Sequence, residues 1–129
     1  MNRKLNNKMK KLRIAIPTKL SISASTFLSI LELYKSPLIN NYYIELKLLA
    51  GKSNIDQSRS MLITEWYDNS CDDDLFLFLD SDQTFTWKDI NDLINLDCDI
   101  ACGVYKSLAG YPTCRPINFD KFVAGESKD

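Results

Sequence analysis

The chain of 129 residues contains no histidine. Histidine is the commonest general base of enzymes and the usual partner of a nucleophilic serine or cysteine, so those arrangements are excluded. The absence also excludes a zinc site that mixes histidine with cysteine. The four cysteines, at positions 71, 98, 102 and 114, lack the paired spacing of a four-cysteine zinc site. We therefore expect free thiols and a reducing, cytoplasmic compartment.

Long apolar runs and a strong net charge are lacking too. No segment approaches the roughly 18 apolar residues of a membrane helix, and Leu12–Ile16 is too short for the core of a signal peptide. A net charge of −1 gives no reason to expect nucleic acid as a partner. We expect residues 1–11 to form a flexible, solvated basic arm, with binding to anionic lipid or polymer as the alternative. We expect residues 12–129 to form one domain.

Strand-like and helix-like patterns alternate along the rest of the chain. We expect strands at residues 12–16, 42–49, 75–79 and 98–105, separated by helices at 21–35, 53–69 and from residue 86. Short connections between such elements predict an α/β fold, with a mainly parallel sheet covered by helices on both faces. In the fourth strand, we expect Cys98 and Cys102 to be buried and Gly103 to mark a close approach of backbone or ligand.

Sequence details support the expected helices. Ser53–Asp56 and Thr86–Asp89 match capping boxes that open the second and third helices. In the first helix the large apolar residues lie mostly at helical spacing, namely Ile22, Phe27, Ile30, Leu31 and Tyr34.

Two carboxylates, Asp80 and Asp82, follow the apolar run Leu75–Leu79 directly. Such a run is typical of a strand buried on both faces, and open α/β sheets bind ligands beyond the carboxyl ends of their strands. In an extended segment the two aspartates share one side and can face one cation, for which magnesium or manganese is the natural choice. The alternative is a solvated acidic turn. Asp72–Asp74 precede the same strand, and we expect them to form a solvated turn at the opposite sheet edge.

Arg59 stands where an apolar residue is expected. On a helix it shares one face with Ile55, Leu62 and Trp66. An unpaired guanidinium beneath a helix is costly, so two interpretations remain open. Either its stem packs while its head reaches water, or it pairs with the acidic site or a bound phosphate.

Four segments give the chain a family resemblance: Arg13–Thr18, Gln57–Ser60, Leu77–Asp82 and Asp97–Tyr105. In order and spacing they resemble the nucleotide-sugar-binding half of GT-A glycosyltransferases, near the family 2-like group that includes viral members. The resemblance covers about residues 12–110. It implies a Rossmann-like GT-A fold for a metal-dependent glycosyltransferase, or for its donor-binding domain.

The resemblance also implies roles for single residues. Pro17 and Thr18 would hold the nucleobase and ribose of a UDP- or GDP-sugar. Asp80, Ser81 and Asp82 would form the aspartate-x-aspartate motif that contacts ribose and a Mn²⁺ or Mg²⁺ ion on the diphosphate. Arg59 would position the motif or the phosphates. The acceptor is a glycan, a protein or a small molecule.

Family members continue into a region that binds the acceptor and supplies a catalytic base. No residue among 83–129 is singled out as that base, so we expect the C-terminal part of the fold to be truncated. Two other functions remain open. One is a nucleotide-sugar-binding module without transferase activity. The other is a haloacid-dehalogenase-like phosphatase with Asp80 as nucleophile and Asp82 as acid–base partner, although two strand–helix units precede the motif here.

Overall fold

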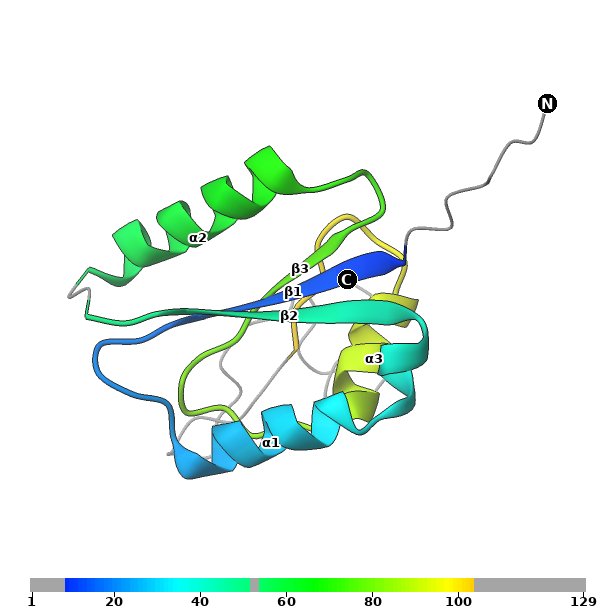
Figure 1. Cartoon of the computed structure of the whole chain (residues 1–129), viewed down its shortest axis with the longest axis horizontal. Helices are drawn as coiled ribbons and strands as arrows, with labels where there is room; N and C mark the ends of the chain where they lie inside the picture. Colours follow the sequence, from blue (N-terminus) through cyan, green and yellow to red (C-terminus); the bar gives the residue numbers. More distant parts are fainter. Residues whose placement is uncertain (1–8, 52–53, 104–129) are drawn as a thin grey trace, which may run out of the picture. The chain divides into compact units, whose positions relative to one another are not determined.

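The structure is a computed structural model that describes residues 9–51 and 54–103 (Figure 1). Its elements are β1 (Lys10–Pro17), α1 (Ala24–Tyr34), the 3₁₀ helix η1 (Pro37–Asn40), β2 (Tyr42–Leu49), α2 (Ile55–Asn69), β3 (Leu75–Phe78) and α3 (Trp87–Asn95). The chain divides after Asn91 into two compact units, and the whole sheet belongs to the first. None of the described helices is both long and apolar enough to cross a membrane.

The three strands form a parallel sheet in the order β2-β1-β3, which confirms the predicted α/β class. The central strand β1 is the most buried, and Leu12, Ile14 and Ile16 are at most 2% exposed. The chain moves from β1 to β2 on one side, then crosses β1 to reach β3 on the other. Right-handed crossovers in opposite directions place their helices on opposite faces, and Figure 1 shows α1 and α2 on the two faces of the sheet.

Helix α1 buries hydroxyl side chains as well as apolar ones. Ser23 caps the helix by accepting a hydrogen bond from the Thr26 amide, and the buried positions are Thr26, Ser29, Ile30 and Leu33. Phe27, Leu31 and Tyr34 are instead 40–50% exposed. Of the apolar residues of α1 that the sequence analysis named at helical spacing, only Ile30 is buried, because hydroxyl side chains that hydrogen-bond the loop after β3 occupy part of the buried face.

The two predicted helix starts differ in outcome. Asn54, rather than Ser53, caps α2: its side-chain oxygen accepts from the amides of Asp56 and Gln57. Ser53 lies outside the described residues. The capping box of α3 is confirmed, because Thr86 and Asp89 exchange side-chain-to-amide hydrogen bonds in both directions.

The predicted fourth strand is not present in its described part, residues 98–103. Asp97 has a left-handed φ of 47°, and the chain then bends as the Cys98 thiol donates to the Ile100 carbonyl. Cys98 and Cys102 are consequently exposed, as is Cys71, contrary to the expectation of buried thiols. A Cβ atom placed on Gly103 would meet no atom of the described residues within 4 Å, so none of these residues approaches this glycine closely.

Candidate functional site

The candidate site lies at the carboxyl edge of the sheet, where the loops after β1 and β3 meet. The two strands are hydrogen-bonded neighbours, and the Leu79 amide extends the pairing by donating to the Ala15 carbonyl. The chain leaves β1 in one direction and reaches β3 from the other, so this edge is the switch point of the sheet. In open α/β sheets, ligands bind at such points.

Asp80 to Gln83 form the acidic turn that follows β3. The turn closes with a hydrogen bond of 3.3 Å from the Gln83 amide to the Asp80 carbonyl. The segment is therefore not extended, and the predicted alternation of side chains does not apply to it. Within the described residues, the exposed Asp82 carboxylate has no hydrogen bond or ion pair. It is a free carboxylate at the mouth of the sheet.

Asp80 is paired with Arg59 of α2. The distance from Arg59 Nη2 to Asp80 Oδ1 is 3.3 Å, and the two side chains are 44% and 39% exposed. The guanidinium carbon also lies 5.8 Å from the centre of the Phe78 ring, within the range of a cation–π contact. Of the two interpretations of Arg59, the structure has the one in which it pairs with the acidic site.

Arg59 is not beneath α2, as its place beside Ile55 suggested. The buried face of the helix is made by Ser58 and Leu62, whereas Ile55 is 40% exposed. The strand below is also less covered than predicted: Leu75–Leu77 are half-buried and Phe78 is exposed, because β3 is the outer strand of the described sheet.

The loop after β1 turns its predicted site residues inward. Pro17 and Thr18 are buried, and the Thr18 hydroxyl donates to the Ser21 carbonyl at 2.6 Å. The Thr18 amide donates to the Leu49 carbonyl of β2. These contacts shape the loop, and its accessible part is Lys19–Ser21, with Leu20 90% exposed.

Three hydroxyl residues near the start of α1 hold the acidic turn in place, and the sequence analysis did not single them out. The Ser23 amide donates to the Ser81 carbonyl at 2.8 Å. The Thr26 hydroxyl donates to the Gln83 carbonyl, and the Ser29 hydroxyl accepts from the Phe85 amide. The sequence signal for these contacts is the serine- and threonine-rich start of the helix. Without knowledge of the partner loop, that composition indicates only helix capping.

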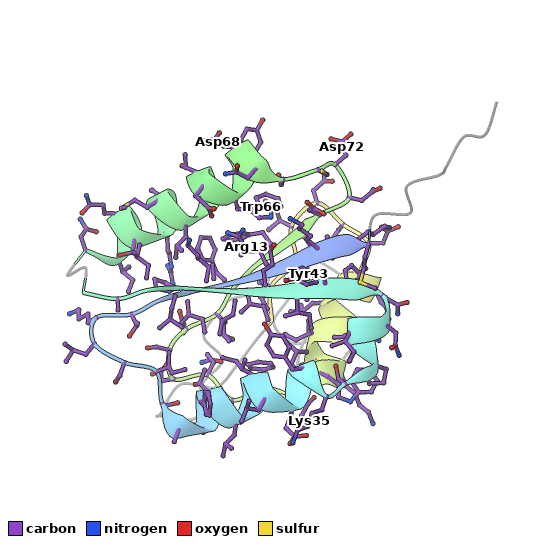
Figure 2. The ribbon with its side chains drawn as sticks, in the orientation of Figure 1. Arg13, Lys35, Tyr43, Trp66, Asp68 and Asp72 are labelled. Atoms are coloured by element: carbon purple, nitrogen blue, oxygen red, sulfur yellow. The ribbon has the colours of Figure 1, made fainter. Side chains whose placement is uncertain are left out.

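A second arginine, Arg13 of β1, lies in the layer between the sheet and α2 (Figure 2). It bonds Glu45, its register partner on β2, and Glu65 on α2, at 2.5–2.9 Å. Burial alone would lower the pKa of Arg13, but the hydrogen bonds that Arg13 donates to Glu65 and Glu45 outweigh it and raise that pKa. Burial likewise raises the pKa of Glu45, but Arg13 and Lys11 outweigh it, so the net change is downward.

Lys11 and Arg13 therefore belong to the sheet. Lys11 lies 3.4 Å from Glu45, and β1 begins at Lys10, so this strand takes in the last two residues assigned to the basic arm. In the turn before β3, Asp72 and Asp73 are exposed. Asp74 accepts from the amides of Lys11 and Cys71 and thereby anchors the turn.

The donor set of the acidic turn fits a hard divalent cation that shares its ligands with a substrate. Over residues 9–51 and 54–103, no three acidic, cysteine or histidine side chains gather into a metal site. Asp80 and Asp82 would supply carboxylate oxygens, and phosphate and water would complete most of a six-coordinate shell. Two hollows, of about 490 and 390 Å³, lie elsewhere on the first unit, beside Thr84–Lys88 and along β2.

No protein-family model matches the chain, and no match was found among curated proteins or among solved structures. The family resemblance therefore depends on the motifs and their placement alone.

Proposed function

We propose that the chain is a metal-dependent glycosyltransferase of GT-A type, or the donor-binding domain of one, that acts on a UDP- or GDP-sugar. The observation that carries the proposal is the acidic turn at the carboxyl end of β3, where Asp80 is held by Arg59 and Asp82 has no partner among residues 9–51 and 54–103. It lies beside the loop after β1, on a parallel α/β sheet. This is the edge at which such sheets bind nucleotides.

Asp80 and Asp82 would hold a Mn²⁺ or Mg²⁺ ion, which when bound neutralises the charge that grows on the departing diphosphate. Arg59 orients Asp80 through the ion pair of 3.3 Å, and the remaining N–H groups of its guanidinium would be available to the phosphates. Ser23, Thr26 and Ser29 fix the turn, so that the carboxylates need little reorganisation when the ion binds.

The nucleobase and ribose are assigned to the loop after β1. Since the Thr18 hydroxyl is already bonded to the Ser21 carbonyl, we assign the direct contacts to the exposed Lys19–Ser21. Pro17 and Thr18 then act by holding the shape of the loop.

A thermal-shift experiment tests donor binding. UDP or GDP should raise the melting temperature only when Mn²⁺ or Mg²⁺ is present, and Asp82→Asn should abolish the increase. Asp73→Asn is the matched control, because Asp73 is an exposed acid in the turn at the opposite end of the same strand. Stabilisation without metal, or equal loss in both variants, would contradict the proposal.

Activity assays on the same protein distinguish a transferase from a binding module and from a phosphatase. Release of labelled sugar from a UDP- or GDP-sugar, lost in Asp82→Asn, identifies a transferase. Metal-dependent nucleotide binding without release identifies a binding module. Hydrolysis of an aryl phosphate that needs Asp80 and no nucleotide would favour the phosphatase.

A further inference from the structure

Strand β2 has an outer edge that no described strand pairs with. The Leu49 carbonyl accepts from Thr18 and so faces β1. Because hydrogen-bonding directions alternate along a strand, the peptide groups of Ile44, Leu46 and Leu48 face away from β1. Long, exposed, apolar edges of this kind recruit a further strand.

The flank of α1 on the same side is apolar and uncovered within the described residues. Thr26 and Ser29 bond the loop after β3, which fixes that flank of the helix. The other flank carries Phe27, Leu31 and Tyr34, and the Tyr34 hydroxyl reaches the Ile44 carbonyl at 3.2 Å. With Leu46 and Leu48 below, each about 40% exposed, it forms the edge patch.

We propose that the edge patch binds a second copy of this chain, through antiparallel pairing of the two β2 strands about a two-fold axis at Leu46. The sequence of β2 is self-complementary in this register. Leu46 meets Leu46 of the other copy, and Ile44 meets Leu48. Glu45 meets Lys47 twice, once on each side of the axis, and opposite charges directly across an antiparallel pair are stabilising.

The two faces of the joined sheet agree with this register. A two-fold axis through one continuous sheet places both α1 helices on one face, so the two Phe27, Leu31 and Tyr34 flanks meet over Leu46 and Leu48. Glu45 and Lys47 lie on the α2 face, where Glu45 already bonds Arg13. Lys47 is exposed and has no ion pair among the described residues, so it is available to the second copy. The two candidate sites then open at opposite ends of the joined sheet, which contains the three described strands of each copy.

Cysteine cross-linking tests the register in the full chain with its four cysteines replaced by serine. In this register the two Cα atoms at position 46 lie about 5.5 Å apart, within disulfide range, whereas those at position 48 lie roughly 13 Å apart. Leu46→Cys should give a disulfide-linked dimer under mild oxidation, and Leu48→Cys should not. Equal cross-linking of both variants, or of neither, would overturn the proposed register.

Sedimentation velocity tests the dimer itself. Leu46→Lys, which sets two lysines against each other at the axis, should weaken dimerisation at least tenfold. Ile63→Lys, a change of the same kind at a similarly exposed position on α2, should leave it unchanged. A wild-type chain that remains monomeric at high micromolar concentration would overturn the proposal, and would mean that Lys47 protects a lone edge or that residues 104–129 cover it.

Discussion

The two arginines on the α2 side of the sheet, Arg13 and Arg59, differ in burial and in the number of their ion-pair partners. Arg13 is 13% exposed in its side chain, and its guanidinium is bonded by Glu45 and Glu65 from two elements. Arg59 is 44% exposed, and its one ion pair among the described residues, at 3.3 Å, is with an aspartate that is itself accessible. The guanidinium of Arg13 uses its hydrogen-bonding capacity inside the fold, whereas that of Arg59 leaves most of it unused by the described residues.

The difference separates a charge cluster that stabilises the fold from the pair that we propose to bind a ligand. A partly buried arginine must be satisfied within the fold, because removing one partner leaves a charge without compensation. An exposed pair contributes little to stability, so its geometry is free to be set by function. Arg13 therefore belongs to a structural cluster with Glu65, near the C-terminal end of α2, and Arg59 belongs to an open pair near the N-terminal end of the same helix.

The largest expected effect is on the structural cluster. Arg13→Met keeps the packing of the stem but leaves Glu45 and Glu65 without their shared cation, so we expect a loss of about 3 kcal/mol in the free energy of unfolding. Urea unfolding at neutral pH measures it. If Arg13→Met cost no more than Arg59→Met, the two arginines would not differ as described.

Glu45→Gln should cost about 2 kcal/mol at neutral pH, because the hydrogen bond to Arg13 loses its charge. The folded pKa of Glu45 lies below its ordinary value of 4.5. Its stabilising effect is therefore fully present above pH 4.5 and is lost as the pH falls through the folded pKa. Unfolding curves of wild type and variant should converge in acid, and a difference that does not change with pH would contradict the assignment.

Arg59→Gln should weaken the metal-dependent binding of UDP or GDP about tenfold, equivalent to about 1.4 kcal/mol. The change removes the positive charge that faces Asp80 and the phosphates. Arg59→Lys should recover part of the affinity, since it keeps the charge without the planar fork. Calorimetric titration measures both variants, and unchanged affinity in Arg59→Gln would remove Arg59 from the site.

The smallest expected effect is that of Arg59→Met on stability. Its partner is accessible to water, so the free energy of unfolding should change by no more than about 0.5 kcal/mol. A larger loss would show that the open pair is structural, and would undo the contrast with Arg13.

Sequence patterns predicted those elements whose periodicity is strong and local. The parallel order of strands and helices followed from alternation, and Thr86–Asp89 followed from its capping box. The buried face of α1 did not, because Thr26 and Ser29 are buried by hydrogen bonds to a loop some 55 residues away. Apolar periodicity carries no information about such partners.

The candidate site shows the same limit. The acids after β3 were predictable from the apolar strand before them, and Arg59 from a charge among apolar positions. The pairing of Arg13 with Glu45 depends on the register between β1 and β2, which no local pattern contains. The segment after Asp97 misled the prediction, because its apolar composition suits a strand while a left-handed residue and a bend redirect the chain.

We propose that the acidic turn binds a divalent cation tightly only together with a diphosphate. A titration of Mn²⁺, followed through the EPR signal of the free ion with and without UDP or GDP, tests it most directly. We predict that the protein alone binds Mn²⁺ weakly. The protein and the nucleotide together should bind Mn²⁺ at least tenfold more tightly than the nucleotide alone does. Asp82→Asn should lose this gain and Asp73→Asn should keep it. Equal binding by wild type and Asp82→Asn would contradict the account.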